Sequence, residues 1–162
     1  MNRSTLTDIS KFIASVAICL IAGFIGSLAT RSSIPTWYAG LSKPPFNPPN
    51  QIFAPVWTIL YVLMGVSAFL IWRKGLQDRQ VQVALSIFAV QLVLNVLWSI
   101  MFFDLRLPFP AFIEIIILWI AILFTILNFR KISIAAAVLM IPYILWVSFA
   151  AVLNFSLWRL NS

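Results

Sequence analysis

The chain has 162 residues, of which 62% are hydrophobic and only 9% are charged. A soluble domain carries about a quarter charged residues, so this composition indicates a protein whose solvent is lipid. The formal charge of +7 would suggest nucleic acid as a partner of a soluble protein, but the few charges here separate apolar runs as topology signals do, so we expect no nucleic-acid partner. Histidine is absent, which removes the commonest metal and haem ligand, and we expect no metal site.

Five apolar stretches are long enough to cross the hydrocarbon core, which takes about 20 helical residues. They are residues 12–30, 52–72, 80–103, 107–129 and 132–158. All the connections are short except the proline-rich segment 31–51, so consecutive helices are antiparallel neighbours. The sequence therefore predicts an all-α membrane protein, a single bundle of five transmembrane helices over residues 1–162. Pro142 lies well inside the last stretch and predicts a kink there.

The distribution of Lys and Arg predicts an orientation in the membrane. Seven of these residues lie in the N-terminal segment and in the connections at 73–79 and 130–131, whereas four lie on the other side. Those four are Arg31, Lys43, Arg106 and Arg159. The excess of positive charge favours an N-terminus inside and a loop 31–51 outside, in a bacterial cell membrane.

Aromatic and polar side chains gather in the predicted outer half of the bundle. Trp57 and Tyr61 share a helix face by their i, i+4 spacing, and amides occur on the third and fifth helices. Flat rings beside small residues make a slot for a flat apolar ligand, although packing and bundle hydrogen bonds explain the same residues. The candidates read from these faces are Ser27, Thr30, Trp57, Tyr61, Asn95, Trp98, Trp146, Phe149, Ala150, Leu153 and Asn154.

Glu114 is the one charge inside the fourth apolar stretch. A carboxyl group in a membrane span is costly and is usually functional. Three interpretations stay open: the group is protonated, it reaches Arg106 near the interface, or it serves a proton or a ligand. The last makes the protein a proton-coupled transporter of small molecules, an alternative that the absence of internal repeats does not favour.

Several motifs in order resemble one family of membrane proteins. They are "WYAGLSKPPFNPP", "PVWTILYVLMG", "QLVLNVLWSIMFF", "PYILWVSFAAVLN" and the closing "WRLN". Together they resemble the translocator protein, or tryptophan-rich sensory protein, family, first described as the peripheral-type benzodiazepine receptor. The likeness covers nearly the whole chain, and several motifs agreeing together are far more specific than any one alone.

The resemblance implies a five-helix bundle, often dimeric, that binds porphyrins and apolar drug-like molecules beneath its first loop. Trp57 and Trp146 match two tryptophans linked to porphyrin binding and to its light-dependent breakdown. Asn95, Ala150 and Leu153 match pocket positions, as do Ser27 and Thr30. The loop that folds over the site is matched by Trp37, Tyr38, Pro44 and Pro45.

The chain departs from the family pattern near its end. Phe155 stands where animal members have a tyrosine proposed to contact cholesterol. The ring keeps its bulk but loses its hydroxyl, which argues against cholesterol as a ligand.

The leading hypothesis is a membrane receptor or sensor for tetrapyrroles such as protoporphyrin IX, with no required cofactor. An enzymatic role in porphyrin photo-oxidation would give Trp57 and Trp146 a catalytic part, but the sequence holds no classical catalytic constellation. A homodimer through the small residues Ala22, Gly23 and Gly26 is one interpretation of the first helix. A close contact between the first two helices explains the same residues equally well.

Overall fold

The chain forms a long bundle of five apolar helical spans, as the sequence predicts. The computed structural model describes residues 3–162. The elements in chain order are α1 (Arg3–Arg31), the 3-10 helix η1 (Tyr38–Gly40), α2 (Asn50–Trp72), α3 (Arg79–Ser99), the π-helix η2 (Ile100–Asp104), α4 (Pro108–Ile132), α5 (Ile134–Leu139) and α6 (Ile141–Leu160). Helices account for the spans because a helix satisfies its own backbone hydrogen bonds where water is absent.

Local sequence signals set the helix ends. The side chain of Asp78 accepts a hydrogen bond from Gln80 N at 2.8 Å and so caps α3, while Ser133 accepts one from Ala136 N and caps α5. Gly75 adopts φ +107° in the α2–α3 turn, a conformation that side chains disfavour. The fifth span is broken at Met140, two residues before Pro142, which confirms the predicted kink.

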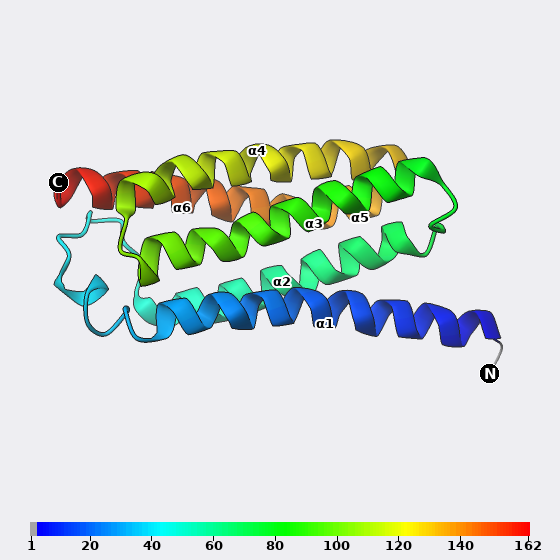
Figure 1. Ribbon diagram of the computed structural model, residues 1–162, viewed down its shortest axis with the longest axis horizontal. Coiled ribbons are helices and arrows are strands. Elements are labelled where there is room, and N and C mark those ends of the chain that lie inside the picture. Colours follow the sequence, from blue (N-terminus) through cyan, green and yellow to red (C-terminus); the bar gives the residue numbers. More distant parts are fainter. Residues whose placement is uncertain (1–2) are drawn as a thin grey trace.

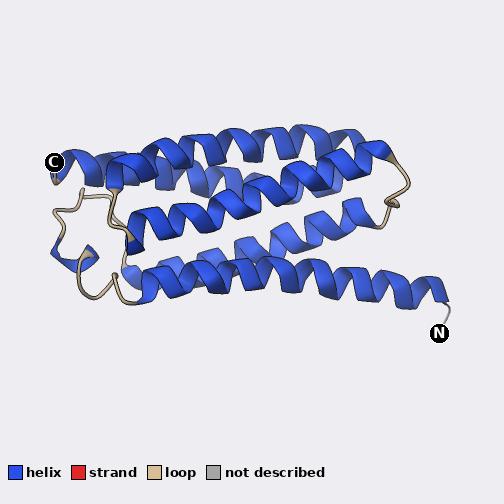
Figure 2. Ribbon diagram, in the orientation of Figure 1, coloured by secondary structure: helices blue, strands red, loops and turns tan. Residues whose placement is uncertain are grey.

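The two ends of the bundle differ in what they contain (Figure 1). The N-terminal end of α1, the α2–α3 turn and the α4–α5 junction lie at one end, and the C-terminus and the segment 32–49 lie at the other. Figure 2 shows that most of the loop lies at this second end, interrupted by the short helix η1. We call residues 32–49 the loop and this end of the bundle the loop side.

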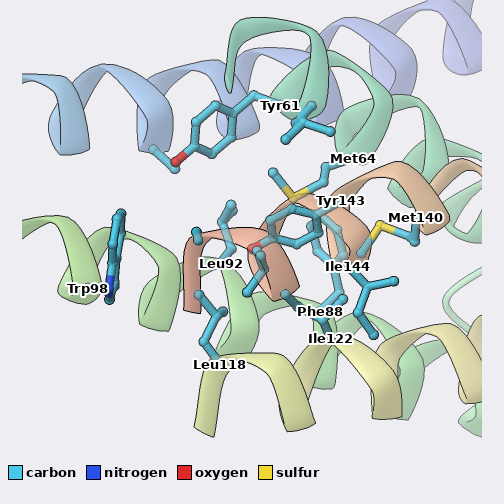
Figure 3. Close-up of a cluster of buried hydrophobic side chains, with 14 of the residues drawn as sticks. Tyr61, Met64, Phe88, Leu92, Trp98, Leu118, Ile122, Met140, Tyr143 and Ile144 are labelled. Atoms are coloured by element: carbon cyan, nitrogen blue, oxygen red, sulfur yellow. The ribbon is translucent and has the colours of Figure 1, made fainter. Parts of the chain in front are cut away.

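The core contains a chain of polar side chains among apolar ones. In Figure 3, Tyr143 of α6 lies in the middle of the buried cluster, close to Met64 and Ile144. Its hydroxyl donates to Gln91 Oε1 at 2.9 Å and accepts from Asn95 Nδ2 at 2.7 Å. Tyr61 donates to Asn95 Oδ1 at 2.5 Å. These bonds link α2, α3 and α6 through groups that would otherwise lack partners in the interior.

The helices α1 and α2 touch at one close crossing. A Cβ atom placed on Gly65 would lie 2.6 Å from Cα of Val16 and 3.1 Å from the carbonyl oxygen of Ser15. Only a glycine lets the two backbones approach this closely. The small residues of this helix pair therefore serve a contact within the chain.

Replacing Gly65 by alanine should destabilise the bundle. The added methyl group meets backbone rather than a flexible side chain, so α1 must shift, and overpacking of this kind costs about 1–3 kcal/mol. Thermal unfolding in detergent should show a lower melting temperature for Gly65→Ala. Gly40→Ala is the matched control, because a Cβ atom there meets nothing within 4 Å. Equal melting temperatures for the parent and Gly65→Ala would contradict the close crossing.

Candidate ligand-binding site

The loop-side half of the bundle contains a roomy cavity. It has a volume of about 380 Å³ and lies between α1, α2 and α3. We call it the α1–α2 cavity. Its walls carry aromatic rings and hydroxyl groups. Its lining residues include Leu20, Gly23, Phe24, Ser27, Thr30, Asn50, Phe53, Ala54, Trp57, Thr58, Tyr61, Trp98, Ser99 and Phe103.

A second, nearly filled space lies beside it, towards α6. Its volume is about 20 Å³, and we call it the tryptophan-lined space. Four aromatic side chains, from α2, α3 and η2, border both volumes and form the partition between them: Phe53, Trp57, Trp98 and Phe103. The tryptophan-lined space is also bordered by Tyr38, Trp146, Phe149, Ala150, Leu153 and Asn154.

The residues predicted as one site are thus divided. Ser27, Thr30 and Tyr61 line the α1–α2 cavity, and Trp57 and Trp98 border both volumes. The other lining candidates face the tryptophan-lined space: Tyr38, Trp146, Phe149, Ala150, Leu153 and Asn154. Five candidates line neither volume: Trp37, Pro44, Pro45, Asn95 and Glu114. Trp57 and Trp146 therefore do not frame an open slot in this conformation.

The aromatic partition is continuous with the loop. The rings of Trp57 and Trp98 have centroids 6.4 Å apart, and Trp98 stacks on Phe102 of the π-helix at 5.5 Å. Trp37 of the loop meets Phe102 edge-on at 5.6 Å. The indole N–H of Trp98 donates to Asn154 Oδ1 at 3.1 Å, which fixes its orientation. The loop therefore rests, through Phe102, on the ring of Trp98, which borders both volumes.

Hydrogen bonds hold the loop at three places. Ser33 Oγ donates to the carbonyl oxygen of Phe103 at 2.6 Å, and Tyr38 donates to Asn47 Oδ1 at 2.7 Å. Asn161, just beyond α6, accepts from Ser42 N and donates to Ser42 O, both at 2.9 Å. This reciprocal pair mimics two strands and fastens the loop to the end of the last helix.

Burial of Tyr38 raises the pKa of its phenol to about 12, and the hydrogen bond to Asn47 opposes that rise. The phenol is therefore neutral and keeps the proton that it donates. Lys43 Nζ lies 5.0 Å from the centroid of the Tyr38 ring and donates to the carbonyl oxygens of Ala39 and Leu41. The ammonium group of Lys43 therefore bonds within the loop, whereas the side chain of Arg31 is exposed at the end of α1.

Glu114 and Trp146 carry the polar side-chain atoms that remain without a partner. Among the described residues, only the two carboxyl oxygens of Glu114 and Nε1 of Trp146 are buried with no hydrogen bond. Glu114 is 5% exposed, and Arg106 is exposed, so the interpretation of a pair between them is wrong. The one ion pair in the described part of the chain joins Arg73 and Asp8 at 3.8 Å.

Sequence reasoning missed Phe53 and Phe103, which border both volumes. Phe53 stands one turn before Trp57 on α2, so the i, i+4 rule that joined Trp57 to Tyr61 applied to it as well. It also missed Gly23 as a wall residue. A Cβ atom there would lie 2.5 Å from the ring of Tyr61, so the glycine makes room for that ring.

These features define an integral membrane protein, a five-helix bundle with aromatic-walled space beneath a fastened loop. The profile of the TspO/MBR family matches residues 15–159, and the chain belongs to that family of membrane sensors and receptors. It is 40% identical over 161 residues to the tryptophan-rich protein TspO of Chlorobaculum tepidum, with 99% of each chain covered.

Two further relatives extend the likeness. The tryptophan-rich protein TspO of Archaeoglobus fulgidus is 43% identical over 156 residues, covering 96% of this chain and 99% of the relative. The translocator protein of Ovis aries is 39% identical over 140 residues, covering 86% and 83%. Family membership thus reaches from archaea and bacteria to animals.

Removing the Asn161 side chain should loosen the loop. Asn161→Ala loses both bonds to Ser42, each a net contribution of about 1 kcal/mol, so transient opening should become roughly thirtyfold more frequent. Hydrogen–deuterium exchange should then be faster at Gly40, Leu41 and Asn47, whose amides are bonded within the loop.

The matched control is Asn128→Ala, which removes an amide that bonds the carbonyl oxygen of Phe124 in its own helix. It should leave exchange in the loop unchanged. Unchanged exchange in Asn161→Ala as well would show that Asn161 does not hold the loop.

Proposed function

We propose that the protein is a membrane receptor that binds porphyrins and other flat apolar molecules in the α1–α2 cavity. The observation that carries the proposal is the 380 Å³ volume bordered by the rings of Trp57, Tyr61 and Trp98. Such rings stack on a conjugated macrocycle, and small-molecule sites are concave and mostly apolar with a few polar groups. We propose further that the loop side faces outward, as the distribution of positive charge favours.

The polar groups of the cavity suit the edge of an amphiphilic ring. Thr30 and Asn50 stand at the loop-side ends of α1 and α2, with Ser27 one turn deeper. Hydroxyl and amide groups there meet the carboxyl substituents of a porphyrin near the membrane surface, while its rings lie among apolar walls. Because the chain has no histidine, free-base porphyrin or a linear tetrapyrrole fits this site better than haem.

Trp57→Phe should weaken the binding of protoporphyrin IX. Losing the larger indole ring at the partition costs about 0.5–1.5 kcal/mol of stacking, which is about threefold to tenfold in Kd. Titration of purified protein in lipid nanodiscs, followed by the porphyrin absorption band, measures the Kd without relying on tryptophan emission.

The matched control is Trp146→Phe, since Trp146 lines the tryptophan-lined space and a surface groove between α2 and α6 but not the α1–α2 cavity. Its Kd should stay within about twofold of the parent value, well below the effect of Trp57→Phe. Equal affinity of Trp57→Phe and the parent would reject the cavity assignment, and absence of binding to the parent would reject the function.

The unpartnered carboxyl group of Glu114 favours a second candidate, proton-coupled transport. An ionised carboxylate without a donor is strongly disfavoured in an apolar interior, so a group of this kind is suited to taking up and releasing a proton. Substrate flux into proteoliposomes should then depend on an imposed proton gradient. Glu114→Gln keeps the shape and removes the titration, and it should abolish that dependence.

The control for this candidate is Glu114→Asp, which retains a carboxyl group at the same position. It should keep part of the gradient-driven flux. Identical flux in the parent and in Glu114→Gln would reject proton coupling, while leaving the receptor proposal untouched.

A further inference from the structure

We propose that the ligand reaches the α1–α2 cavity sideways from the loop-side leaflet of the membrane, between α1 and α2, while the loop stays closed. This inference rests on the proposed function and concerns how the site is reached. It reverses the expectation that the loop is the moving cover of the site. Three features of the described residues lead to it: the exposure of the cavity walls, the spacing of two helices and the fastening of the loop.

The cavity reaches the outer surface of the bundle along the seam between α1 and α2. On the α1 side, Leu20, Phe24 and Ser27 line the cavity and are also exposed, Phe24 at 63%. On the α2 side, Ala54 and Thr58 do the same. Residues that line a cavity and are exposed on the bundle surface mark its mouth, and in a membrane this mouth meets acyl chains.

The spacing of the two helices confines this mouth to the loop side. At Gly65 the backbones of α2 and α1 are in direct contact, with Val16 opposite. Nearer the loop, the ring of Tyr61 stands between the helices against Gly23. The helices are therefore separated by a side chain in one half and touch in the other, which leaves a gap that begins at about the level of Tyr61.

The loop offers no comparable path. The hydrogen bonds of Ser33 to Phe103 and of Asn161 to Ser42 tie it to η2 and to the end of α6, and Trp37 packs on Phe102. Opening it would break these bonds and expose aromatic rings to water. The mouth between α1 and α2 requires only the movement of exposed side chains such as Phe24, which exchange rotamers rapidly.

The polarity of the cavity matches a molecule that arrives from the leaflet. Leu20 lies about 16 Å below the end of α1 at about 1.5 Å per residue, whereas Thr30 and Asn50 lie at the loop-side ends of α1 and α2. An amphiphilic flat molecule dissolved in the leaflet has its apolar body and polar edge at these same depths. It can therefore slide in without reversing its orientation or crossing water.

The test measures association rates of protoporphyrin IX delivered from preloaded phosphatidylcholine vesicles to protein in similar vesicles. Phe24→Ala widens the mouth and should raise the association rate by about threefold or more; since Phe24 also lines the cavity, the dissociation rate is expected to rise as well. Phe124→Ala is the matched control, since Phe124 is 53% exposed on α4 and lines neither volume. It should leave both rates unchanged.

The second arm uses Asn161→Ala, in which the loop opens more often. Access between α1 and α2 predicts the parent association rate for this variant. Faster association in Asn161→Ala together with unchanged rates in Phe24→Ala would overturn the lateral route and assign access to the loop. Absence of any porphyrin binding to the parent is a different result, because it removes the proposed function itself.

Discussion

Every polar group buried in this bundle has to find its partner inside the protein, because the hydrocarbon core supplies none. The spans meet the requirement for their backbones by being helical. The buried polar side chains meet the requirement through a hydrogen-bond network. This network runs from Tyr61 through Asn95 and Tyr143 to Gln91 and joins three helices. Asn95 and Tyr143 each bond two members of this network, and Tyr61 and Gln91 bond one each, so the relative positions of α2, α3 and α6 depend on it. The cavity wall formed by Tyr61 inherits that rigidity.

The same constraint shapes the loop. Pro44, Pro45, Pro48 and Pro49 have no amide hydrogen and need no acceptor. Most of the remaining polar groups are paired locally, as with Asn47, or to the bundle, as with Ser42. Because few hydrogen-bond donors of the loop lack an acceptor, covering aromatic rings with it costs little free energy. Its prolines also restrict the unfolded chain, which reduces the entropy lost on ordering.

The fold followed from the sequence, whereas the shape of the site did not. The predicted stretch 80–103 became Arg79–Asp104, because charged residues mark both of its ends. The first helix begins well before residue 12, because Asp8 and Lys11 do not stop a helix that extends beyond the hydrocarbon core. Helical spacing placed Trp57 and Trp146 on inward faces, but it does not reveal which neighbouring ring fills the space between them. Phe53, which meets Trp146 at 6.2 Å, separates what had been one predicted pocket into two.

In the described part of the chain, the buried side-chain polar groups that lack a hydrogen-bond partner lie in the loop-side part of the bundle. Two buried hydroxyls away from the loop are paired: Ser67 donates to the carbonyl oxygen of Ala136 and Thr125 to that of Ala121. Glu114, within about two turns of the loop-side start of α4, and Trp146, at the tryptophan-lined space, are not. Unpaired buried groups cost about 1–3 kcal/mol each. The close crossing at Gly65 and the hydrogen-bonded core supply the stability that lets the loop side keep such groups and an open cavity.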